Sequence, residues 1–326
     1  MNRINISHTA GSKNRNGAAE KAPVEISVII CTFNRCESLK DTLDSLLNQE
    51  YDNGFEYEVI VVDNNSTDQT KKVIESYKPV FNGRLHYLFE PKQGKPYALN
   101  KAIKNAQGEI IAFTDDDCLV YKEWLLQIKK SFNGGNPGIG MAGGIITPLW
   151  LTQNKPQWIR DSFMGPLGIL NYGDKKAFID EKKLLFGNNF AVKKNLFKSF
   201  SDFDVKMINS HDTEICLRFL KTGAKGLYNP DMKVSHKITS ERATTKYFYK
   251  WFYRRGKFWD YIEYFSGNRK VKFYHPLGIP LWVFIAIAKE FAKSFFAPSQ
   301  YLAIKHRCMA FFYLGKLIKR FKENIA

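Results

Sequence analysis

The sequence predicts an α/β fold with a doubly wound, mostly parallel sheet, followed by a C-terminal extension of amphipathic helices. Apolar, β-branched runs alternate with segments of helical periodicity over the first 120 residues, and this alternation predicts the sheet. Polar residues follow the runs, at the strand ends where parallel sheets bind their ligands. The last quarter of the chain is basic and aromatic, and its periodicity predicts the helical extension.

Four apolar runs predict the parallel strands, namely 26–33, 58–63, 84–90 and 109–114. The segments between them carry apolar residues at helical spacing, so each is expected to form a helix that crosses over the sheet. In the second of these helices Ser66 or Thr67 is a candidate N-cap, and Gly108 ends the third. The polar segments after the first, second and fourth strands should therefore meet at one edge of the sheet.

The pattern changes after residue 134. Short apolar runs over 139–146 and 184–192 alternate with loops that contain Gly, Pro and Trp. This favours an antiparallel extension of the sheet over further crossovers. A helix is predicted over 212–222.

The extension spans residues 241–326 and holds +12 of the net charge of +17, because it contains 17 Lys and Arg against 5 Asp and Glu. Basic residues interleaved with aromatic ones favour an anionic partner surface. The apolar stretch after Pro276 is shorter than the ~20 residues that a spanning helix needs, so the helices would lie on a membrane surface. The alternative is that two ordinary amphipathic helices pack on the domain.

Both of these helices separate apolar from basic side chains. In the first, Lys289 and Lys293 lie off a face that is shared by Leu281, Phe284, Ile285, Ala288 and Phe295. In the last, around 314–321, the basic residues Lys316, Lys319, Arg320 and Lys322 are separated from Leu314, Leu317, Ile318 and Phe321.

The remaining composition indicates where the protein works. Five cysteines without paired spacing argue against a disulfide framework and favour a reducing compartment. Residues 1–24 are polar, lack the apolar core of a secretory signal, and are expected to form a disordered tail. No zinc spacing, RNP-like motif or basic recognition helix is present, so nucleic acid is not an expected partner. These features predict a cytoplasmic protein that is peripheral on the inner face of the plasma membrane.

The strand over 109–114 runs directly into three aspartates, Asp115, Asp116 and Asp117. Adjacent carboxylates repel one another unless a cation lies among them, and Mg²⁺ or Mn²⁺ prefers oxygen ligands of this kind. In an extended segment residues i and i+2 point the same way, so Asp115 and Asp117 would face one site while Asp116 turns aside or reaches a ribose. The alternative is a solvated acidic turn that caps a helix beginning near Lys122.

Five sequence blocks resemble, in order, those of glycosyltransferase family 2: ISVIICTFNR, EVIVVDNNSTDQT, GKPYALNKAIKNAQGEIIAFTDDDC, FGNNFAVKK and HDTEICLRFLKTGAKGLYNPDMKVSH. The resemblance covers 25–236 and implies an inverting, nucleotide-sugar-dependent enzyme of the A-type glycosyltransferase (GT-A) fold. It implies a glycosyltransferase domain over 25–240, with a Rossmann-like nucleotide-sugar half (25–120) and an acceptor half (121–240). The extension loosely resembles the tails of bacterial surface-polysaccharide transferases.

The resemblance implies donor-binding roles for residues at the strand ends. Thr32, Asn34 and Arg35 match the loop that flanks the nucleobase and diphosphate of the donor. Asp63 matches a residue that hydrogen-bonds the base, usually uracil, and a carboxylate is a good acceptor for an imide N–H. The alternative for Asp63 is a cap for the following helix. Lys95 lies where family members place a basic donor-binding residue, or is a solvated lysine beside a helix start.

Asp115 and Asp117 match the outer positions of the family's Asp-x-Asp motif. The resemblance implies that Asp115 and Asp116 bind the donor, and that Asp117 and Asp115 hold a Mg²⁺ or Mn²⁺ ion on its diphosphate. His236 matches a histidine that supplies another metal ligand in some related enzymes. The alternative is that His236 is a structural hydrogen-bonding residue.

Inversion requires a base that deprotonates the acceptor hydroxyl as it attacks the donor sugar. The family's base is the Asp of a Glu-Asp pair that opens a helix, and here the pair reads His211-Asp212. Asp212 therefore inherits the role, while His211 departs from the usual acidic residue on the acceptor side. Gly187, Asn188 and Asn189 match a loop beside the acceptor.

Arg254 and Arg255 are candidates to close over the diphosphate as charge-assisted clamps, or to grip lipid phosphates. The combined expectation is transfer from a UDP-sugar to a hydroxyl of a glycan or a polyprenyl-diphosphate-linked glycan in polysaccharide biosynthesis. One alternative is a catalytically inactive nucleotide-sugar-binding scaffold of a glycan-assembly complex. A nucleotidyltransferase is a weaker alternative, because CTFNRCESL lacks the glycine-rich loop that would admit a triphosphate.

Overall fold

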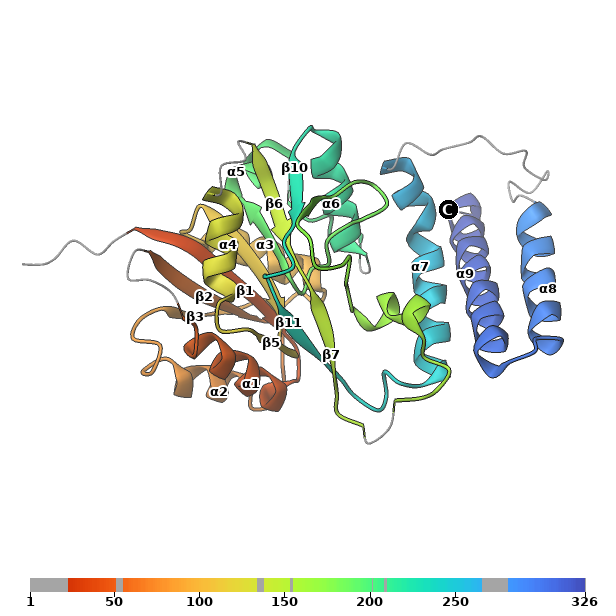
Figure 1. Ribbon diagram of the computed structural model, residues 1–326, viewed down its shortest axis with the longest axis horizontal. Coiled ribbons are helices and arrows are strands. Elements are labelled where there is room, and N and C mark those ends of the chain that lie inside the picture. Colours follow the sequence, from red (N-terminus) through yellow and green to blue (C-terminus); the bar gives the residue numbers. More distant parts are fainter. Residues whose placement is uncertain are drawn as a thin grey trace, which may run out of the picture.

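The computed structural model of the chain describes residues 23–50, 55–133, 138–152, 155–200, 202–207, 210–265 and 281–325. Figure 1 shows an α/β part beside three long helices. These helices are α7 (Thr245–Phe265), α8 (Leu281–Phe295) and α9 (Gln300–Ile325). The tail predicted over 1–24 falls almost wholly outside the described residues.

The larger sheet has eight strands in the order β3-β2-β1-β4-β9-β6-β10-β8. Its first four strands in sequence are parallel neighbours: β1 Val24–Thr32, β2 Glu56–Asp63, β3 Leu85–Phe89 and β4 Ile110–Asp115. The parallel half predicted from the apolar runs is therefore confirmed. Thr32 pairs in register with Asp63, and Cys31 with Asp115, so the three strand ends meet at one edge.

Helices cover both faces of this sheet, as a doubly wound fold requires (Figure 1). The first four are α1 Cys36–Leu47, α2 Thr70–Tyr77, α3 Lys95–Asn105 and α4 Trp124–Asn133. Side chains of α1, α2 and α4 join one buried cluster, and those of α3 join the other. The N-cap prediction for α2 was wrong: the helix begins at Thr70, whose N–H donates to Asp68 Oδ1 over 3.0 Å.

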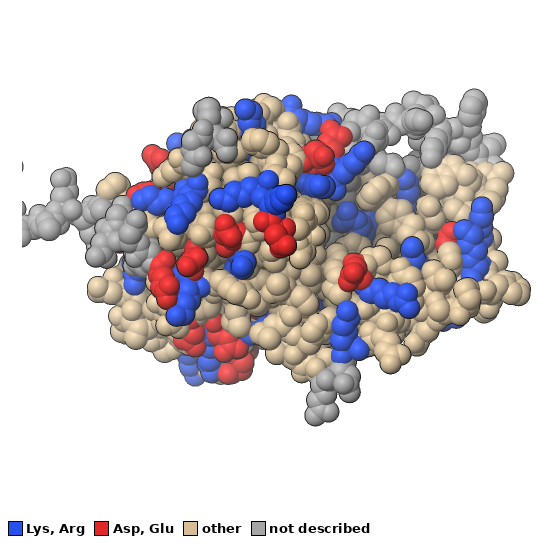
Figure 2. Space-filling view, in the orientation of Figure 1, with Lys and Arg blue, Asp and Glu red and all other residues tan. Residues whose placement is uncertain are grey.

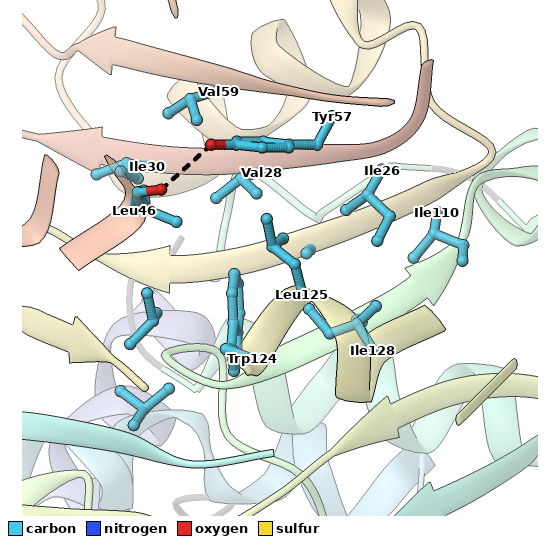
Figure 3. Packing of buried hydrophobic residues seen from close by; sticks show 14 of the residues in the cluster. Ile26, Val28, Ile30, Leu46, Tyr57, Val59, Ile110, Trp124, Leu125 and Ile128 are labelled. Atoms are coloured by element: carbon cyan, nitrogen blue, oxygen red, sulfur yellow. Dashed lines mark hydrogen bonds between the residues drawn. The ribbon is translucent and has the colours of Figure 1, made fainter. Parts of the chain in front are cut away.

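The strands are continuous apolar runs in sequence because buried clusters lie on both faces of the sheet, one of them between the sheet and α4. Figure 3 shows Leu125 and Ile128 of α4 pointing toward Val28 and its neighbours on the strands. In the same cluster the Tyr57 hydroxyl donates to the Leu46 carbonyl over 3.2 Å, so this buried hydroxyl keeps a hydrogen-bond partner. Each large apolar side chain buried in this way contributes roughly 1.5–3 kcal/mol to folding.

The second half of the domain extends the sheet with mixed pairing. β9 (Phe190–Lys193) is antiparallel to β4 and to β6 (Ile139–Gly143), as the antiparallel extension predicts. The prediction was incomplete, because β10 (Lys225–Tyr228) is parallel to β6 and antiparallel to the short β8 (Ala177–Phe178). Helix α5 spans Lys194–Phe200, and α6 spans His211–Lys221, within one residue of its prediction.

A smaller sheet carries His236 to the aspartate segment. Its order is β5-β11-β7, with β5 at Cys118–Val120, β7 at Ile146–Trp150 and β11 at Val234–Ile238. His236 pairs in register with Cys118, the residue that follows Asp117. Sequence-distant metal-ligand candidates are therefore brought together by one antiparallel pairing.

Helix α9 lies between α7 and α8 and is far longer than the helix predicted over 314–321 (Figure 1). It approaches α7 through two glycines. A Cβ at Gly256 would lie 1.9 Å from the Phe312 carbonyl oxygen, and one at Gly315 would lie 2.0 Å from that of Tyr253. The two backbones touch at this crossing, where no larger residue fits.

The predicted apolar faces of α8 and α9 have different surroundings. On α8, Leu281 and Ile285 are each 58% exposed, whereas Leu317 of α9 is buried against Val283. Lys316 was expected on a polar face but is buried in the helix bundle. Within the described residues, the three helices included, we find no helix with the length and apolar character of a membrane span. The predicted roles of Phe321, Lys319, Arg320 and Lys322 concern side chains outside the described set.

Candidate active site

The loops after β1 and β2 are tied together beside the strand ends. Asn34 adopts a positive φ of 51° and its Oδ1 accepts from the Thr67 N–H over 2.7 Å, while its own N–H donates to Ser66 Oγ over 2.9 Å. Asp63 is buried: its Oδ1 accepts from the Ser66 N–H over 2.8 Å and its Oδ2 from the Tyr87 hydroxyl over 3.2 Å. These bonds hold the loop and do not cap α2, which begins at Thr70, so the helix-cap alternative for Asp63 was wrong and its base-binding role remains a prediction.

The three aspartates separate into two groups. Strand β4 ends at Asp115 and a turn follows, so the extended geometry that would align Asp115 with Asp117 does not continue. Asp115 pairs with the Lys95 ammonium. Asp116 and Asp117 instead share Arg35, whose Nη1 lies 3.0 Å from Asp116 Oδ1 and 2.7 Å from Asp117 Oδ2.

Asp117 has a second cationic partner that the sequence analysis did not identify. Arg242 Nη2 donates to Asp117 Oδ2 over 2.8 Å, and Arg242 Nη1 donates to His236 Nε2 over 2.7 Å. The signal available in the sequence was a basic residue six positions after the candidate ligand His236, directly before a helix. Arginine pairs therefore offset the repulsion among these carboxylates in the protein itself.

The pKa values of the two buried carboxylates, Asp116 and Asp117, are shifted in opposite directions. Burial raises the pKa of Asp117, but the guanidinium groups of Arg242 and Arg35 outweigh it and hold that pKa well below its ordinary value. Burial and the negative charge of Asp117 raise the pKa of Asp116 to about 6, against the attraction of Arg35. Asp117 is thus the carboxylate that stays ionised and is suited to bind a cation.

The donor set at Asp117 fits a hard divalent ion. An arginine only donates, so His236 Nε2 must accept from Arg242, and Nδ1 then carries the proton that is donated to the Leu167 carbonyl over 2.7 Å. His236 Nε2 faces Asp117 Oδ1 at 3.2 Å. Both atoms are acceptors and cannot hydrogen-bond each other, whereas a metal ion could bind the lone pairs of both. The adjacent Cys118 is no ligand of this kind, because burial raises the pKa of its thiol.

A hollow of about 500 Å³ joins most of the predicted catalytic and acceptor-side residues. It lies between the α/β part and the C-terminal helices, where Figure 2 shows a recess with Lys and Arg side chains in its wall. Its lining contains these predicted residues: Lys95, Asp115, Asn188, His211, Asp212, His236, Arg254 and Arg255. The lining does not include the other predicted residues: Thr32, Asn34, Arg35, Asp63, Asp116, Asp117 and Asn189.

Asp212 lies in the first turn of α6 and is held by backbone donors. Its Oδ2 accepts from the Gly187 N–H over 3.1 Å, and its Oδ1 from the Thr213 N–H over 2.8 Å. Burial raises the pKa of Asp212, yet His211, these two N–H groups and Lys95 lower it further, so its pKa lies below the ordinary value. The carboxylate is therefore ionised at neutral pH and oriented toward the hollow.

His211 is a neutral imidazole beside that carboxylate. Burial lowers its pKa to about 4, and Lys95 acts in the same direction, against the attraction of Asp212. Among the described residues, none hydrogen-bonds His211 Nδ1. The residue that replaces the usual acid thus brings no charge to the site at pH 7.

The structure separates the two acceptor-side asparagines. Asn188 lines the hollow, and its Nδ2 donates to the Gly168 carbonyl over 3.1 Å. Asn189 is completely buried, and its Oδ1 accepts from Trp124 Nε1 over 2.9 Å while its Nδ2 donates to two backbone carbonyls. The acceptor-side prediction for Asn189 was therefore wrong, because its amide is used up inside the core.

The two adjacent arginines of α7 also differ. Arg254 is exposed at the rim, whereas Arg255 lies between two tryptophans, with its guanidinium carbon 5.3 Å from the Trp251 ring centroid and 5.6 Å from that of Trp259. Arg255 Nη1 donates to Ser210 Oγ over 3.4 Å. No carboxylate of the described residues forms an ion pair with Arg255.

Comparison with known proteins finds a family match for residues 27–185. The model of "Glycosyl transferase family 2" matches residues 27–185. The curated "Glucosyl-dolichyl phosphate glucuronosyltransferase" of Haloferax volcanii is 25% identical over 232 residues, which are 67% of this chain and 71% of that protein.

Solved structures confirm the fold. The mannosyltransferase PcManGT from Pyrobaculum calidifontis, in complex with GDP-Man and Mn²⁺, superposes with a TM-score of 0.61 at 20% identity over 93% of this chain and 90% of that one. S. aureus TarS 1–349, in complex with UDP-GlcNAc, superposes with a TM-score of 0.52 at 17% identity over 90% of each chain. The chain is therefore a glycosyltransferase of the GT-A fold whose residues 27–185 form a glycosyl transferase family 2 domain.

Proposed function

We propose that the chain is an inverting enzyme that moves a sugar from a UDP-sugar to a hydroxyl of a glycan or lipid-linked glycan in polysaccharide biosynthesis. The observation that carries this proposal is an ionised Asp212 carboxylate in the wall of a 500 Å³ hollow that Asp115 and His236 also line. The UDP-GlcNAc bound by TarS supports the donor class, and the name of the Haloferax relative supports a lipid-linked acceptor.

Asp212 acts as the general base. Gly187 and Thr213 fix its two oxygens through backbone N–H groups, which leaves lone pairs free to take the proton of the acceptor hydroxyl. The proton leaves that hydroxyl as its oxygen attacks the anomeric carbon from the face opposite the diphosphate. Because attack is direct, inversion requires a proton acceptor and no covalent intermediate on the protein.

Asp117 and His236 would hold a Mg²⁺ or Mn²⁺ ion, and Asp115 borders the same region. When bound, the ion neutralises negative charge on the departing diphosphate. Lys95, whose pKa is raised by Asp115 despite the opposing effect of burial, remains charged and adds a cation on the donor side. Arg242 would have to release His236 Nε2 before that nitrogen could bind the ion.

The test is a screen of nucleotide sugars that measures released UDP in the presence of Mn²⁺, with and without chelator. Asp212→Asn should lower transfer by roughly 10²–10⁴-fold, the usual contribution of a general base, while UDP still binds. Asp231→Asn, at an exposed carboxylate outside the hollow, is the matched control. Full transfer by Asp212→Asn would contradict the proposal, and UDP binding without turnover on any acceptor would favour the inactive scaffold.

We also propose that α8 rests on an anionic membrane surface on the cytoplasmic side. Its outward face exposes Leu281, Phe284 and Ile285, and Lys289 and Lys293 lie on the same helix. Ile285→Asp should abolish flotation with liposomes that contain phosphatidylglycerol. Phe178→Asp, at an equally exposed apolar residue of β8, should float like the native protein. Equal flotation of both variants would show that α8 is not the binding face.

A further inference from the structure

A second hollow, of about 590 Å³, opens beside the active-site hollow. Five residues line both: Gly165, Pro166, Phe186, Trp251 and Arg255. Its volume is in the range of ordinary small-molecule sites. The two spaces therefore adjoin, and a ligand that reaches Asp212 has a place for a second moiety.

The wall of the second hollow is aromatic and comes from all three C-terminal helices. Trp259 of α7 packs edge to face on Phe312 of α9 with ring centroids 5.3 Å apart, and Trp282 of α8 lies under the Lys316 ammonium at 5.5 Å. Its charged lining residues are Arg255 and the buried Lys316, both cations. No Asp, Glu, Asn or Gln belongs to the described lining.

This chemistry favours an amphiphilic anion over a glycan. Oligosaccharides carry hydroxyls along their whole length, and protein sites that bind them combine stacking aromatic rings with carboxylates and amides, which the described lining lacks. The aromatic surface and the Arg255 guanidinium match an apolar chain that carries a phosphate. α8, which contributes Trp282 here, exposes its apolar Leu281 and Ile285 to the outside, so a chain could enter from a lipid phase.

Arg255 lies where a phosphate beside the acceptor sugar would be. Its Nη1 reaches Ser210 Oγ at 3.4 Å, and Ser210 stands two residues before Asp212. Arg255, Ser210 and Asp212 all line the active-site hollow, so the guanidinium and the base border the same space. Desolvation also lowers the pKa of Arg255, against the attraction of Asp212, as expected for a half-buried cation whose positive charge is not fully compensated.

We propose that the second hollow binds the isoprenoid chain of a lipid-phosphate acceptor, with the phosphate on Arg255 and the phosphate-linked sugar presenting its hydroxyl to Asp212. This inference rests on the proposed function and names its substrate class. It adds a specific consequence: the sugar that is glycosylated is the one attached to the phosphate, not a sugar farther along a glycan.

The test is calorimetric titration of the full chain with farnesyl phosphate, without donor or metal. We expect saturable binding that weakens at least 10-fold in Arg255→Gln and in Trp259→Ala, and less in Arg255→Lys. Farnesol and inorganic phosphate should each bind at least 10-fold more weakly than farnesyl phosphate. The matched control is Arg160→Gln, because Arg160 also stacks on an aromatic ring, that of Tyr301 at 4.8 Å, but lies outside the hollow.

Unchanged binding in both Arg255 variants, with thermal unfolding like that of the native chain, would overturn the inference, since the ligand would then bind elsewhere. Binding of maltotriose in place of farnesyl phosphate would overturn it in favour of a glycan subsite. A parallel titration with UDP and Mn²⁺, and Asp212-dependent UDP release, test the proposed function separately. Failure there with farnesyl phosphate still bound contradicts the function, whereas the reverse result contradicts only this inference.

Discussion

The two charged ends of the active-site region are built in opposite ways. At one end Asp117 is buried against two guanidinium groups and an imidazole, so its charge is compensated before any ligand arrives. At the other end Arg255 lies half-buried between tryptophans, with no described carboxylate paired to it. A cation that binds at the first end must displace Arg242 from His236. An anion that binds at the second end can pair with Arg255 without displacing a described carboxylate.

The two ends also differ in what fixes them. The carboxylate end follows strand β4 and is bounded by β11, so hydrogen-bonded strands with buried apolar side chains position it. The cation end depends on α7, which is positioned by its contact with α9 at Gly256 and Gly315. We therefore expect substitutions at the first end to act on chemistry, and substitutions in the helices to act through position and stability.

The largest effect is expected from Asp117→Asn. Loss of this charge removes the proposed ionised metal ligand and leaves Arg35 and Arg242 facing a neutral amide. Transfer should fall on the order of 10²–10³-fold, and its dependence on Mn²⁺ should disappear. Initial rates over a Mn²⁺ titration measure both. Asp41→Asn, which removes an exposed partner of Lys237, is the control and should keep the native response. A Mn²⁺ response in Asp117→Asn equal to the native one would remove Asp117 from the metal site.

The next effect concerns pH, at the centre of the hollow. Because the pKa of His211 is lowered to about 4 in the folded state, the unfolded chain binds more protons there between that value and the ordinary 6.5. Folding stability should therefore fall as pH drops from 6.5 toward 4, by up to roughly 2–3 kcal/mol from this residue. Urea unfolding at pH 7.0 and 4.5 should show a smaller loss for His211→Gln than for the native chain. Equal losses would contradict a buried neutral imidazole.

A smaller effect is expected where the helices cross. The Cβ of Gly315→Ala would lie 2.0 Å from the Tyr253 carbonyl oxygen, so α9 must move away from α7. Overpacking of this kind costs about 1–3 kcal/mol, which thermal unfolding would detect. Lys305→Ala, at an exposed position of the same helix and outside both hollows, is the matched control. Because the carboxylate end does not depend on this crossing, Mn²⁺ and UDP binding should survive in both variants, and their loss in Gly315→Ala would refute the separation of the two ends.

The sequence predicts the end built on strands better than the end built on helices. Buried parallel strands have a plain apolar pattern, so 26–33 and 109–114 locate the aspartates at the edge of the sheet. The pattern does not reveal the turn at Asp116, because the extended geometry stops where the apolar run stops. Asn189 was misassigned for a related reason: an amide next to a candidate ligand-binding residue looks the same in sequence whether it faces a pocket or the core.

Arg242 and Lys316 show what pattern reading misses. Both lie in a segment where basic residues are frequent, so neither stands out by composition. Their surroundings depend on long-range contacts. Arg242 reaches Asp117 because β11 pairs with β5, and Lys316 is buried because α9 packs against α8. Helical periodicity placed Lys316 on a polar face, but its neighbours across the bundle bury it.

The smallest effect, and the most direct comparison of the two ends, is expected from Arg242→Gln. Arg242 donates to His236 Nε2, one of the two atoms that a divalent ion would take, and to Asp117 Oδ2, beside the other, Asp117 Oδ1. Removal of this competitor, and of its positive charge, should tighten Mn²⁺ binding several-fold in the absence of donor, about 1 kcal/mol in free energy. Titration of free Mn²⁺ by electron paramagnetic resonance measures the dissociation constant, with Arg160→Gln as the control. If Arg242→Gln bound Mn²⁺ no better than the control, the arginine would not occupy the ion's place, and the carboxylate end would be as open to its ligand as the cation end.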